Sequence, residues 1–207
     1  MEAIRLQIGP NEFAAQYQQR PAPPGGNLAD VRKIKLTERS EVPADLILFR
    51  AWDLALTTKA MSDYSCGAYG GIDRKTGDMY LLSMSRGKRQ WGDQKKQIIG
   101  LALAESVGGT IGIETAAAFE IAEIELKAAL NGRVMVRGYK PAKDKVTRAN
   151  PWLALLDAGK FHMVRGAWNQ DFTQEVEQFP NGLHDDQVDA VSLLWEMARK
   201  RQALRVA

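Results

Sequence analysis

Strand-like and helix-like segments alternate along most of the chain after residue 45. A short apolar run at 46–52 is typical of a strand buried inside a sheet. Two further strand-like runs, at 66–70 and 79–84, flank a polar turn at 73–78 and predict a β-hairpin. Beyond the hairpin we expect, in order, helix 91–107, strand 110–113, helix 116–130, strand 134–136 and helices at about 147–158 and 184–200. This order predicts an α/β protein with a mixed sheet flanked by helices, in which an antiparallel three-strand edge is continued by parallel strands.

The first 45 residues differ in character from the rest. Residues 13–20 form a polar run that is compatible with a helix, and the Pro- and Gly-rich stretch 21–26 interrupts any regular structure. We therefore expect residues 1–45 to be an arm or linker, 46–200 to be the compact domain and 201–207 to be a short tail.

Composition excludes several classes of protein. With 207 residues, of which 45% are hydrophobic and 26% charged, the chain can bury a core and is neither disordered, collagenous nor a coiled coil. Its apolar runs are shorter than the roughly 18–20 residues that cross a bilayer, so we expect no membrane role. We also expect no secretory signal, and the single Cys66 can form neither an internal disulfide nor a zinc site by itself. The cytosol, or the cytoplasm of a cell that a virus has entered, fits best.

Positive charge is concentrated in two segments, although the net charge is only +3. Residues 86–96 hold five basic side chains against one acid, and residues 131–168 hold eight against two. Segregated charge of this kind indicates either a polyanion such as nucleic acid or a set of solvated loops.

The most informative segment is acidic and lies at 184–190. On a helix, Asp185, Asp186 and Asp189 share an arc about 100° wide beside an apolar stripe. Three carboxylates so close together repel each other. Either the positive end of the helix or a bound divalent cation can relieve that repulsion, and the burial of one side of the helix favours the cation.

Two further acids each follow a predicted buried strand. Asp53 comes directly after the strand at 46–52, and Glu114 directly after the strand at 110–113. Ligands of α/β sheets bind at such strand ends. Because no Cys or His cluster accompanies these acids, the oxygen donors predict Mg²⁺ or Mn²⁺ and not zinc.

These three motifs together resemble a known family. The order WDLA at 52–55, IET at 113–115 and HDDQVDA at 184–190 closely resembles the C-terminal nuclease domain of phage terminase large subunits, which has a ribonuclease-H-like fold. The segment FAAQYQQRP at 13–21 is similar to the connector that joins the packaging ATPase to this nuclease, so the resemblance covers nearly the whole chain.

The resemblance implies an endonuclease that cuts concatemeric double-stranded DNA by two-metal hydrolysis with Mg²⁺ or Mn²⁺. It implies that Asp53 bridges two metal ions and that Glu114 also binds them. Asp185 and Asp186 would be the paired catalytic aspartates that open the last helix and bind metal, with Asp186 expected to be the direct ligand. Asp189 would be an occasional ligand or would support the others, and His184 would either contact the scissile phosphate or cap the helix. The basic residues expected to bind DNA phosphates are Lys88, Arg89, Lys143, Lys145 and Arg148.

The sequence departs from a full terminase large subunit in one respect. It has no Gly-x-x-x-x-Gly-Lys-Ser/Thr phosphate loop: Gly87 and Lys88 are followed by Arg89, and Leu82 stands where the first glycine belongs. We therefore expect no ATP hydrolysis. The chain would be a fragment, the product of a truncated gene or a nuclease that works with a separate motor, and its expected partners are DNA, a packaging ATPase domain, the small terminase subunit and the portal.

Other functions fit parts of the same pattern. Another ribonuclease-H-like enzyme, such as a junction resolvase or a transposase core, would use the same acids on a different DNA substrate. A DNA-binding or motor-docking module without catalytic activity would have lost metal binding. A phosphatase is disfavoured because Leu54 and Ala55 follow Asp53, so that no Asp-x-Asp motif is present. Three residues that could stack or react, Trp52, Trp152 and Cys66, are expected in the core instead.

Overall fold

The computed structural model describes residues 28–55, 64–105, 110–115 and 120–203. The helix-compatible run expected at 13–20 lies outside these residues. No helix in the described ranges is both long enough and apolar enough to span a membrane.

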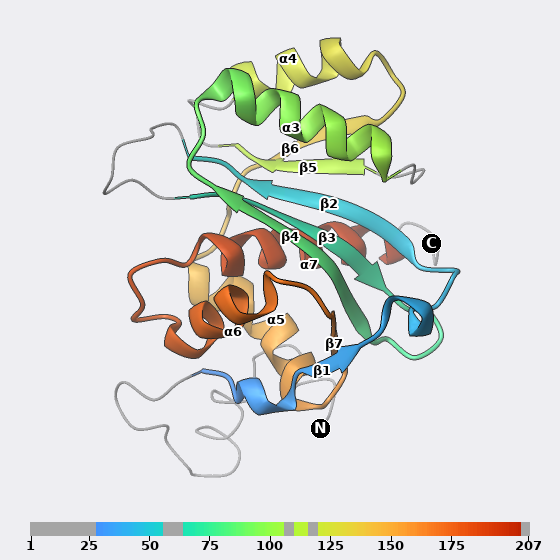
Figure 1. Cartoon of the computed structure of the whole chain (residues 1–207), viewed down its shortest axis with the longest axis vertical. Helices are drawn as coiled ribbons and strands as arrows, with labels where there is room; N and C mark the ends of the chain where they lie inside the picture. Colours follow the sequence, from blue (N-terminus) through green and yellow to red (C-terminus); the bar gives the residue numbers. More distant parts are fainter. Residues whose placement is uncertain (1–27, 56–63, 106–109, 116–119, 204–207) are drawn as a thin grey trace.

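One mixed sheet runs through the middle of the molecule (Figure 1). Its seven strands are β1 (Lys35–Thr37), β2 (Ile47–Asp53), β3 (Ser65–Ile72), β4 (Met79–Gly87), β5 (Thr110–Glu114), β6 (Met135–Tyr139) and β7 (Phe161–Val164). They lie in the order β1-β7-β4-β3-β2-β5-β6. β2, β3 and β4 pair antiparallel, whereas β5 pairs parallel with β2 and β6 pairs parallel with β5. The expected mixed sheet, in which antiparallel strands are continued by parallel ones, is confirmed. The antiparallel strands β2, β3 and β4 nevertheless lie inside the sheet and not at its edge, because β7 and β1 extend it beyond β4.

Helices cover both faces of this sheet (Figure 1). The helix α3 (Trp91–Ala104) and the helix α4 (Glu120–Leu130) lie on one face. On the opposite face lie α5 (Lys145–Asp157), α6 (Asn169–Gln178) and α7 (Asp186–Ala203). Two single-turn 3₁₀ helices, η1 (Val31–Lys33) and η2 (Arg39–Glu41), flank β1.

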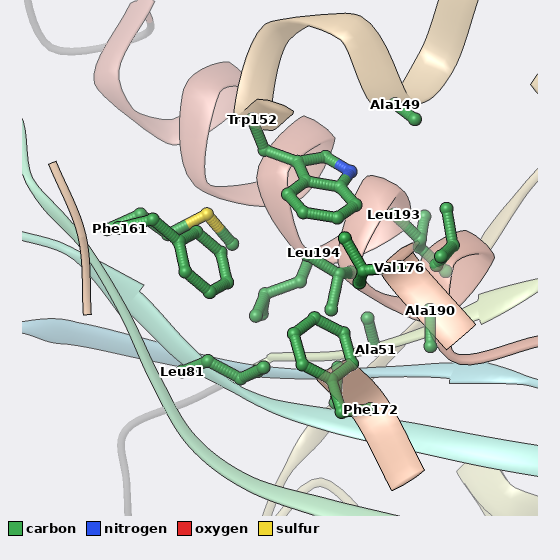
Figure 2. Packing of buried hydrophobic residues seen from close by; sticks show 14 of the residues in the cluster. Ala51, Leu81, Ala149, Trp152, Phe161, Phe172, Val176, Ala190, Leu193 and Leu194 are labelled. Carbon is green, nitrogen blue, oxygen red and sulfur yellow. The ribbon is translucent and has the colours of Figure 1, made fainter. Parts of the chain in front are cut away.

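Alternating side chains of β2 separate two hydrophobic cores. Phe49 and Ala51 pack in the core under α5, α6 and α7, whereas Trp52 packs in the core under α3 and α4. In the first core, the ring of Trp152 lies beside that of Phe161 (Figure 2), with the two centroids 5.5 Å apart. The indole N–H of Trp152 donates to Ser192 Oγ at 3.0 Å.

The expected burial of Trp52, Trp152 and Cys66 is confirmed, since all three are fully buried. Helix α4 ends where the sequence predicts, because Asn131 and Gly132 both adopt positive φ, at 45° and 76°.

Three elements were not predicted from the sequence: β1, β7 and α6. β1 lies upstream of the expected domain boundary at residue 45 and pairs parallel with β7 at one edge of the sheet. The domain boundary at residue 45 stays a prediction, although residues 35–37, which precede it, form a strand of the sheet.

The β3–β4 pair contains an irregularity that matters for the site. Its register shifts by one residue between Tyr69 and Gly70, so that Gly70 pairs with Leu81 but Tyr69 pairs with Ser83. Beyond the shift, Cys66 pairs with Arg86. Because side chains alternate between the two faces of a sheet, this single shift decides on which face the side chain of Arg86 lies.

Candidate metal and DNA site

Two acids end neighbouring parallel strands. β2 ends at Asp53 and β5 ends at Glu114. Trp52 pairs with Ile113, so Asp53 and Glu114 come one step further along, side by side. Asp53 shares its face of the sheet with Ala51, which packs under α5, α6 and α7.

Glu114 faces the same helices. Gly112, two residues earlier on the same face, lies so close to α7 that a Cβ atom there would be 2.2 Å from Met197 Sδ. The missing side chain lets α7 approach β5 closely. Both strand-end acids therefore point to the face on which α7 lies.

Helix α7 supplies the remaining carboxylates. It begins at Asp186, and Asp186 and Asp189 both lie in its first turn, each only 4% exposed. Asp185 immediately precedes the helix, and its carbonyl accepts the Asp189 N–H at 2.9 Å. Negative side chains at this end interact favourably with the helix dipole, which offsets part of their repulsion.

A sixth acid, Glu175, fixes the start of α7 without joining the cluster. Glu175 on α6 is 5% exposed and accepts the backbone N–H of Gln187 at 2.6 Å and of Val188 at 3.2 Å. Its second oxygen accepts Gln187 Nε2 at 2.6 Å. These bonds satisfy N–H groups that have no partner within α7, and so tie the helix that carries Asp186 and Asp189 to α6.

Two basic side chains from the first turn of α5 lie between the carboxylates. Arg148 Nη1 lies 3.2 Å from Glu114 Oε1 and 3.5 Å from Asp189 Oδ1, and Arg148 Nη2 also contacts Glu114 Oε2. Lys145 Nζ lies 2.6 Å from Asp185 Oδ1 and 3.4 Å from Asp189 Oδ2. Burial lowers the pKa of both basic groups, but these carboxylates outweigh it and the pKa of each is raised. One helix thus links the acid of β5 to the acids at the start of α7.

Burial and neighbouring negative charges raise the pKa of two carboxyl groups in the cluster. Burial raises the pKa of Asp53 well above its ordinary value, and the negative charges of Glu114, Asp189 and Asp186 raise it further. Burial also raises the pKa of Asp189 to about 6, against the opposing effect of the basic side chains of α5. Asp53 therefore lies within electrostatic range of acids on both β5 and α7.

The donor chemistry of the cluster fits a hard divalent cation. Its side-chain donors are carboxylate oxygens, which Mg²⁺ and Mn²⁺ prefer. Asp189 Oδ1 is buried and accepts no hydrogen bond in the described part of the chain. In this conformation, no group of three or more His, Cys, Asp or Glu side chains among the described residues is arranged to hold a metal ion. Lys145 and Arg148 contact Glu114, Asp185 and Asp189, so a cation bound by these three acids would have to take the place of the basic side chains.

The other predicted DNA contacts are distributed around this cluster. His184 Nδ1 lies 3.8 Å from Asp186 Oδ2. Lys88 Nζ lies 4.6 Å from the ring centroid of Tyr64, and the guanidinium of Arg89 folds back over Gly87. Lys143 is exposed, just before α5, and is not brought into the cluster. The assignment of all these residues to DNA stays a prediction.

Sequence reasoning missed three residues next to the acids: Tyr64, Arg86 and Glu175. The N–H of Tyr64 donates to Asp186 Oδ2 at 3.2 Å, and the Arg86 guanidinium lies 3.8 Å from the Tyr64 ring centroid. Arg86 was noticed only as part of a basic segment, and Glu175 lies in the helix that was not predicted. A single carboxylate on the helix that precedes an acidic helix start gives no signal of its own in a single sequence.

Comparison with known proteins identifies the family. The model of the family described as the terminase RNase H-like domain matches residues 50–198, a stretch that contains Asp53, Glu114 and all three acids around the start of α7. The chain belongs to the terminase RNase H-like domain family. It is thus homologous to the nuclease domains of phage large terminases. A comparison with curated protein sequences gives no significant match.

Solved terminase structures share the fold of this terminase domain. The P22 large terminase nuclease domain is 14% identical, with a TM-score of 0.61 over 82% of this chain and 90% of that one. The large terminase nuclease of the thermophilic phage G20c, solved with bound magnesium, is 16% identical, with a TM-score of 0.58 over 84% and 98%. That of bacteriophage SPP1, solved with bound manganese, is 15% identical, with a TM-score of 0.56 over 82% and 98%. At these identities the likeness shows the ribonuclease-H-like fold.

Proposed function

We propose that this terminase domain is a metal-dependent endonuclease that cuts concatemeric double-stranded DNA during viral genome packaging. The observation that carries the proposal is the convergence of the two strand-end acids, Asp53 and Glu114, with the acids at the start of α7 in a member of the terminase family. Acids from distant parts of the sequence are held together here at an electrostatic cost, which a cation would offset.

We infer that Asp53, Glu114 and Asp186 hold two Mg²⁺ or Mn²⁺ ions, with Asp185 and Asp189 within reach as further ligands. Bound there, such ions would activate water and neutralise charge that develops on the phosphodiester. The chain supplies the carboxylates, and Glu175 keeps those of α7 in position. The protein need not supply a general base.

The basic side chains of α5 have two tasks in this proposal. Without a cation, Lys145 and Arg148 neutralise the acids. If cations occupied the carboxylates, these side chains would become available for DNA phosphates. Together with Lys88, Arg89 and Lys143 they would hold the duplex through its backbone, with little sequence preference and with affinity that falls as salt rises. His184 would contact a phosphate near Asp186.

We propose that the enzyme acts in the cytoplasm of the host cell together with a packaging ATPase domain, the small terminase subunit and the portal. Two observations support this assignment: the family is that of packaging terminases, and the sequence lacks a phosphate loop of its own.

Plasmid digestion tests the function directly. Supercoiled plasmid is incubated with the protein in Mg²⁺, in Mn²⁺ or in a chelator, and the products are separated on a gel. We expect cleavage only with a cation. Asp53→Asn should lower the rate roughly a hundredfold or more because a ligand is lost, while DNA binding is retained. Asp45→Asn, which removes an exposed acid paired with Lys75, is the matched control and should cut normally.

Cleavage that persists in a chelator, or that is unchanged by Asp53→Asn, would contradict the proposal. A four-way DNA junction is tested in parallel with linear duplex. Preferential cutting of the junction would assign the same acids to a resolvase and not to a packaging nuclease.

A further inference from the structure

A second cluster of side chains lies at the same end of the sheet as the acids. Tyr64 immediately precedes β3, and Arg86 and Lys88 lie at the end of β4 and just beyond it. Asp53 pairs with Cys66, and Cys66 pairs with Arg86, so the three residues form one row across β2, β3 and β4. Side chains in one row share a face, so Arg86 projects on the same face as Asp53.

The same row gives the distance between Arg86 and Asp53. Neighbouring strands lie about 4.8 Å apart, so Arg86 stands roughly 10 Å across the sheet from Asp53. A DNA strand carries one phosphate per about 3.4 Å of helix axis, so a few nucleotides of one strand can span this distance. The second cluster is therefore within reach of the same DNA strand as the carboxylates.

Both basic side chains of this cluster contact one aromatic ring, that of Tyr64. The Arg86 guanidinium lies 3.8 Å and Lys88 Nζ 4.6 Å from the centroid of the Tyr64 ring. Both contacts are cation–π interactions, which hold a cation without neutralising it. The edge of the His184 ring meets the same tyrosine, with the centroids 5.0 Å apart.

The acids nearest to Arg86 lie at long ion-pair distances. Arg86 lies 3.9 Å from Asp171 Oδ2 and 4.0 Å from Glu175 Oε2, at the limit of an ion pair. Glu175 already accepts three hydrogen bonds at the start of α7. Arg86 Nε is buried and has no hydrogen-bond partner in the part of the chain that the structure describes. Arg86 is thus positioned by the tyrosine ring and keeps capacity to bind an anion.

The same tyrosine is tied to the carboxylate cluster. Its backbone N–H donates to Asp186 Oδ2 at 3.2 Å, while its ring carries the two cations. An anion bound by Arg86 and Lys88 would consequently be held at a fixed place relative to Asp186.

We propose that Tyr64, Arg86 and Lys88 form a phosphate-binding site for the DNA strand that is cut, a few nucleotides from the scissile bond. The proposal rests on the proposed nuclease function and adds to it the residues that position the strand. Arg86 and Lys88 bind the phosphate, and Tyr64 is a positioning residue that acts through both of them. The recognised chemistry is the phosphodiester, so the site is expected to be indifferent to sequence.

Binding in a chelator tests this site separately from cleavage. Fluorescence anisotropy of a labelled duplex of roughly 30 base pairs is measured for the full chain between about 50 and 200 mM salt. Each phosphate contact contributes about 0.9 to the slope of log K against log salt, so Arg86→Met and Lys88→Gln should each lower the slope by about 1 and weaken binding severalfold. Tyr64→Leu should weaken binding, and Tyr64→Phe should restore it because the ring is kept.

Lys75→Gln is the matched control. This lysine is exposed in the turn at the opposite end of β3 and β4, and its loss should leave the slope unchanged. Slopes that stay at the wild-type value in Arg86→Met and Lys88→Gln overturn the proposal, as does an equal loss in Lys75→Gln. Thermal melting of each variant identifies any loss that comes from unfolding, and Lys88→Gln remains decisive if Arg86→Met fails to fold.

The two proposals fail in different ways. If wild type cuts plasmid with Mn²⁺ but the variants keep the full salt slope, the phosphate site is wrong and the nuclease assignment stands. If the variants lose slope but no cation supports cutting, the binding site stands and the nuclease assignment is wrong.

Discussion

Glu175 and Asp186 lie at the same end of α7, but their carboxylates have different partners. Glu175 accepts three N–H groups from Gln187 and Val188 and is buried among them, whereas Asp186 accepts the N–H of Tyr64 and faces the other acids. The first arrangement is that of a residue that holds a helix in place, and the second that of a residue that can bind a ligand. Residue type alone does not separate these roles.

Replacing Glu175 should therefore weaken the fold as well as the site. Gln keeps one acceptor oxygen but loses the negative charge that binds the start of α7. Hydrogen bonds to charged groups contribute about 1.5–3 kcal/mol each, so we expect Glu175→Gln to lower the free energy of unfolding by roughly 1–3 kcal/mol. Urea unfolding measures the change. Glu177→Gln alters an exposed residue of the same helix and should cost little; an equal cost in both variants would contradict this role.

The acidity of Asp189 predicts how stability depends on pH without a cation. Its folded pKa of about 6 lies above its ordinary value of 3.8, so between these two values the folded state binds more protons than the unfolded state. Stability from this group is present at low pH and falls as pH rises from about 4 to 6, by on the order of 2–3 kcal/mol. Chemical unfolding in a chelator should show this slope, and Asp189→Asn should reduce it. A slope that is the same in the variant would show that other groups cause it.

Among the strands, the register shift between Tyr69 and Gly70 has the clearest consequence. It turns the end of β4 so that Arg86 lies in the row of Cys66 and Asp53. A Cβ atom on Gly70 would lie 2.1 Å from the backbone oxygen of Tyr80, an atom that cannot move without disturbing the pairing. The register shift therefore requires a glycine at position 70.

Gly70→Ala should lower the free energy of unfolding by about 1–3 kcal/mol, since the added methyl group has to displace β4. Gly100→Ala provides the opposite case: a Cβ there meets nothing within 4 Å, and alanine favours the helix α3 by about 0.5–1 kcal/mol. Thermal melting of both variants measures the difference. If Gly70→Ala were as stable as Gly100→Ala, the strand pairing would be more adaptable than the structure indicates.

The sequence predicts those elements that carry their own pattern. The strand observed at 47–53 was predicted at 46–52 because it is a continuous apolar run, and the helix observed at 186–203 was predicted at about 184–200 because its apolar residues form a stripe at helical spacing. β1 and β7 were missed because each is three or four residues long and is stabilised mainly by pairing with other strands. α6 was missed because only Phe172 and Val176 mark its buried face among polar residues.

The positions of the candidate acids in the fold were predicted to the same extent. Acids at strand ends and at a helix start are visible in the sequence, and the structure brings Asp53, Glu114 and the α7 acids to one face. That Lys145 and Arg148 point into the acids depends on how α5 packs beside α7, and no local pattern encodes that packing.

For the domain as a whole, cation binding should appear as added stability. A ligand that binds only the folded state at a hundred times its dissociation constant adds about 2.7 kcal/mol. For a domain of this size we expect Mg²⁺ or Mn²⁺ to raise the melting temperature by roughly 5–10 °C and a chelator to reverse the shift. Asp53→Asn should abolish it and Asp45→Asn should keep it. Equal shifts in both variants would indicate cation binding elsewhere on the surface.

Lys145 and Arg148 are three residues apart on one helix, so a single rigid element carries both counter-charges of the cluster. If α5 slid along its axis by one helical turn, about 5.4 Å, both would leave their acids in the same movement. Glu114, Asp185 and Asp189 would then be uncovered together and not one at a time. The position of α5 therefore decides whether these three acids are free to bind cations.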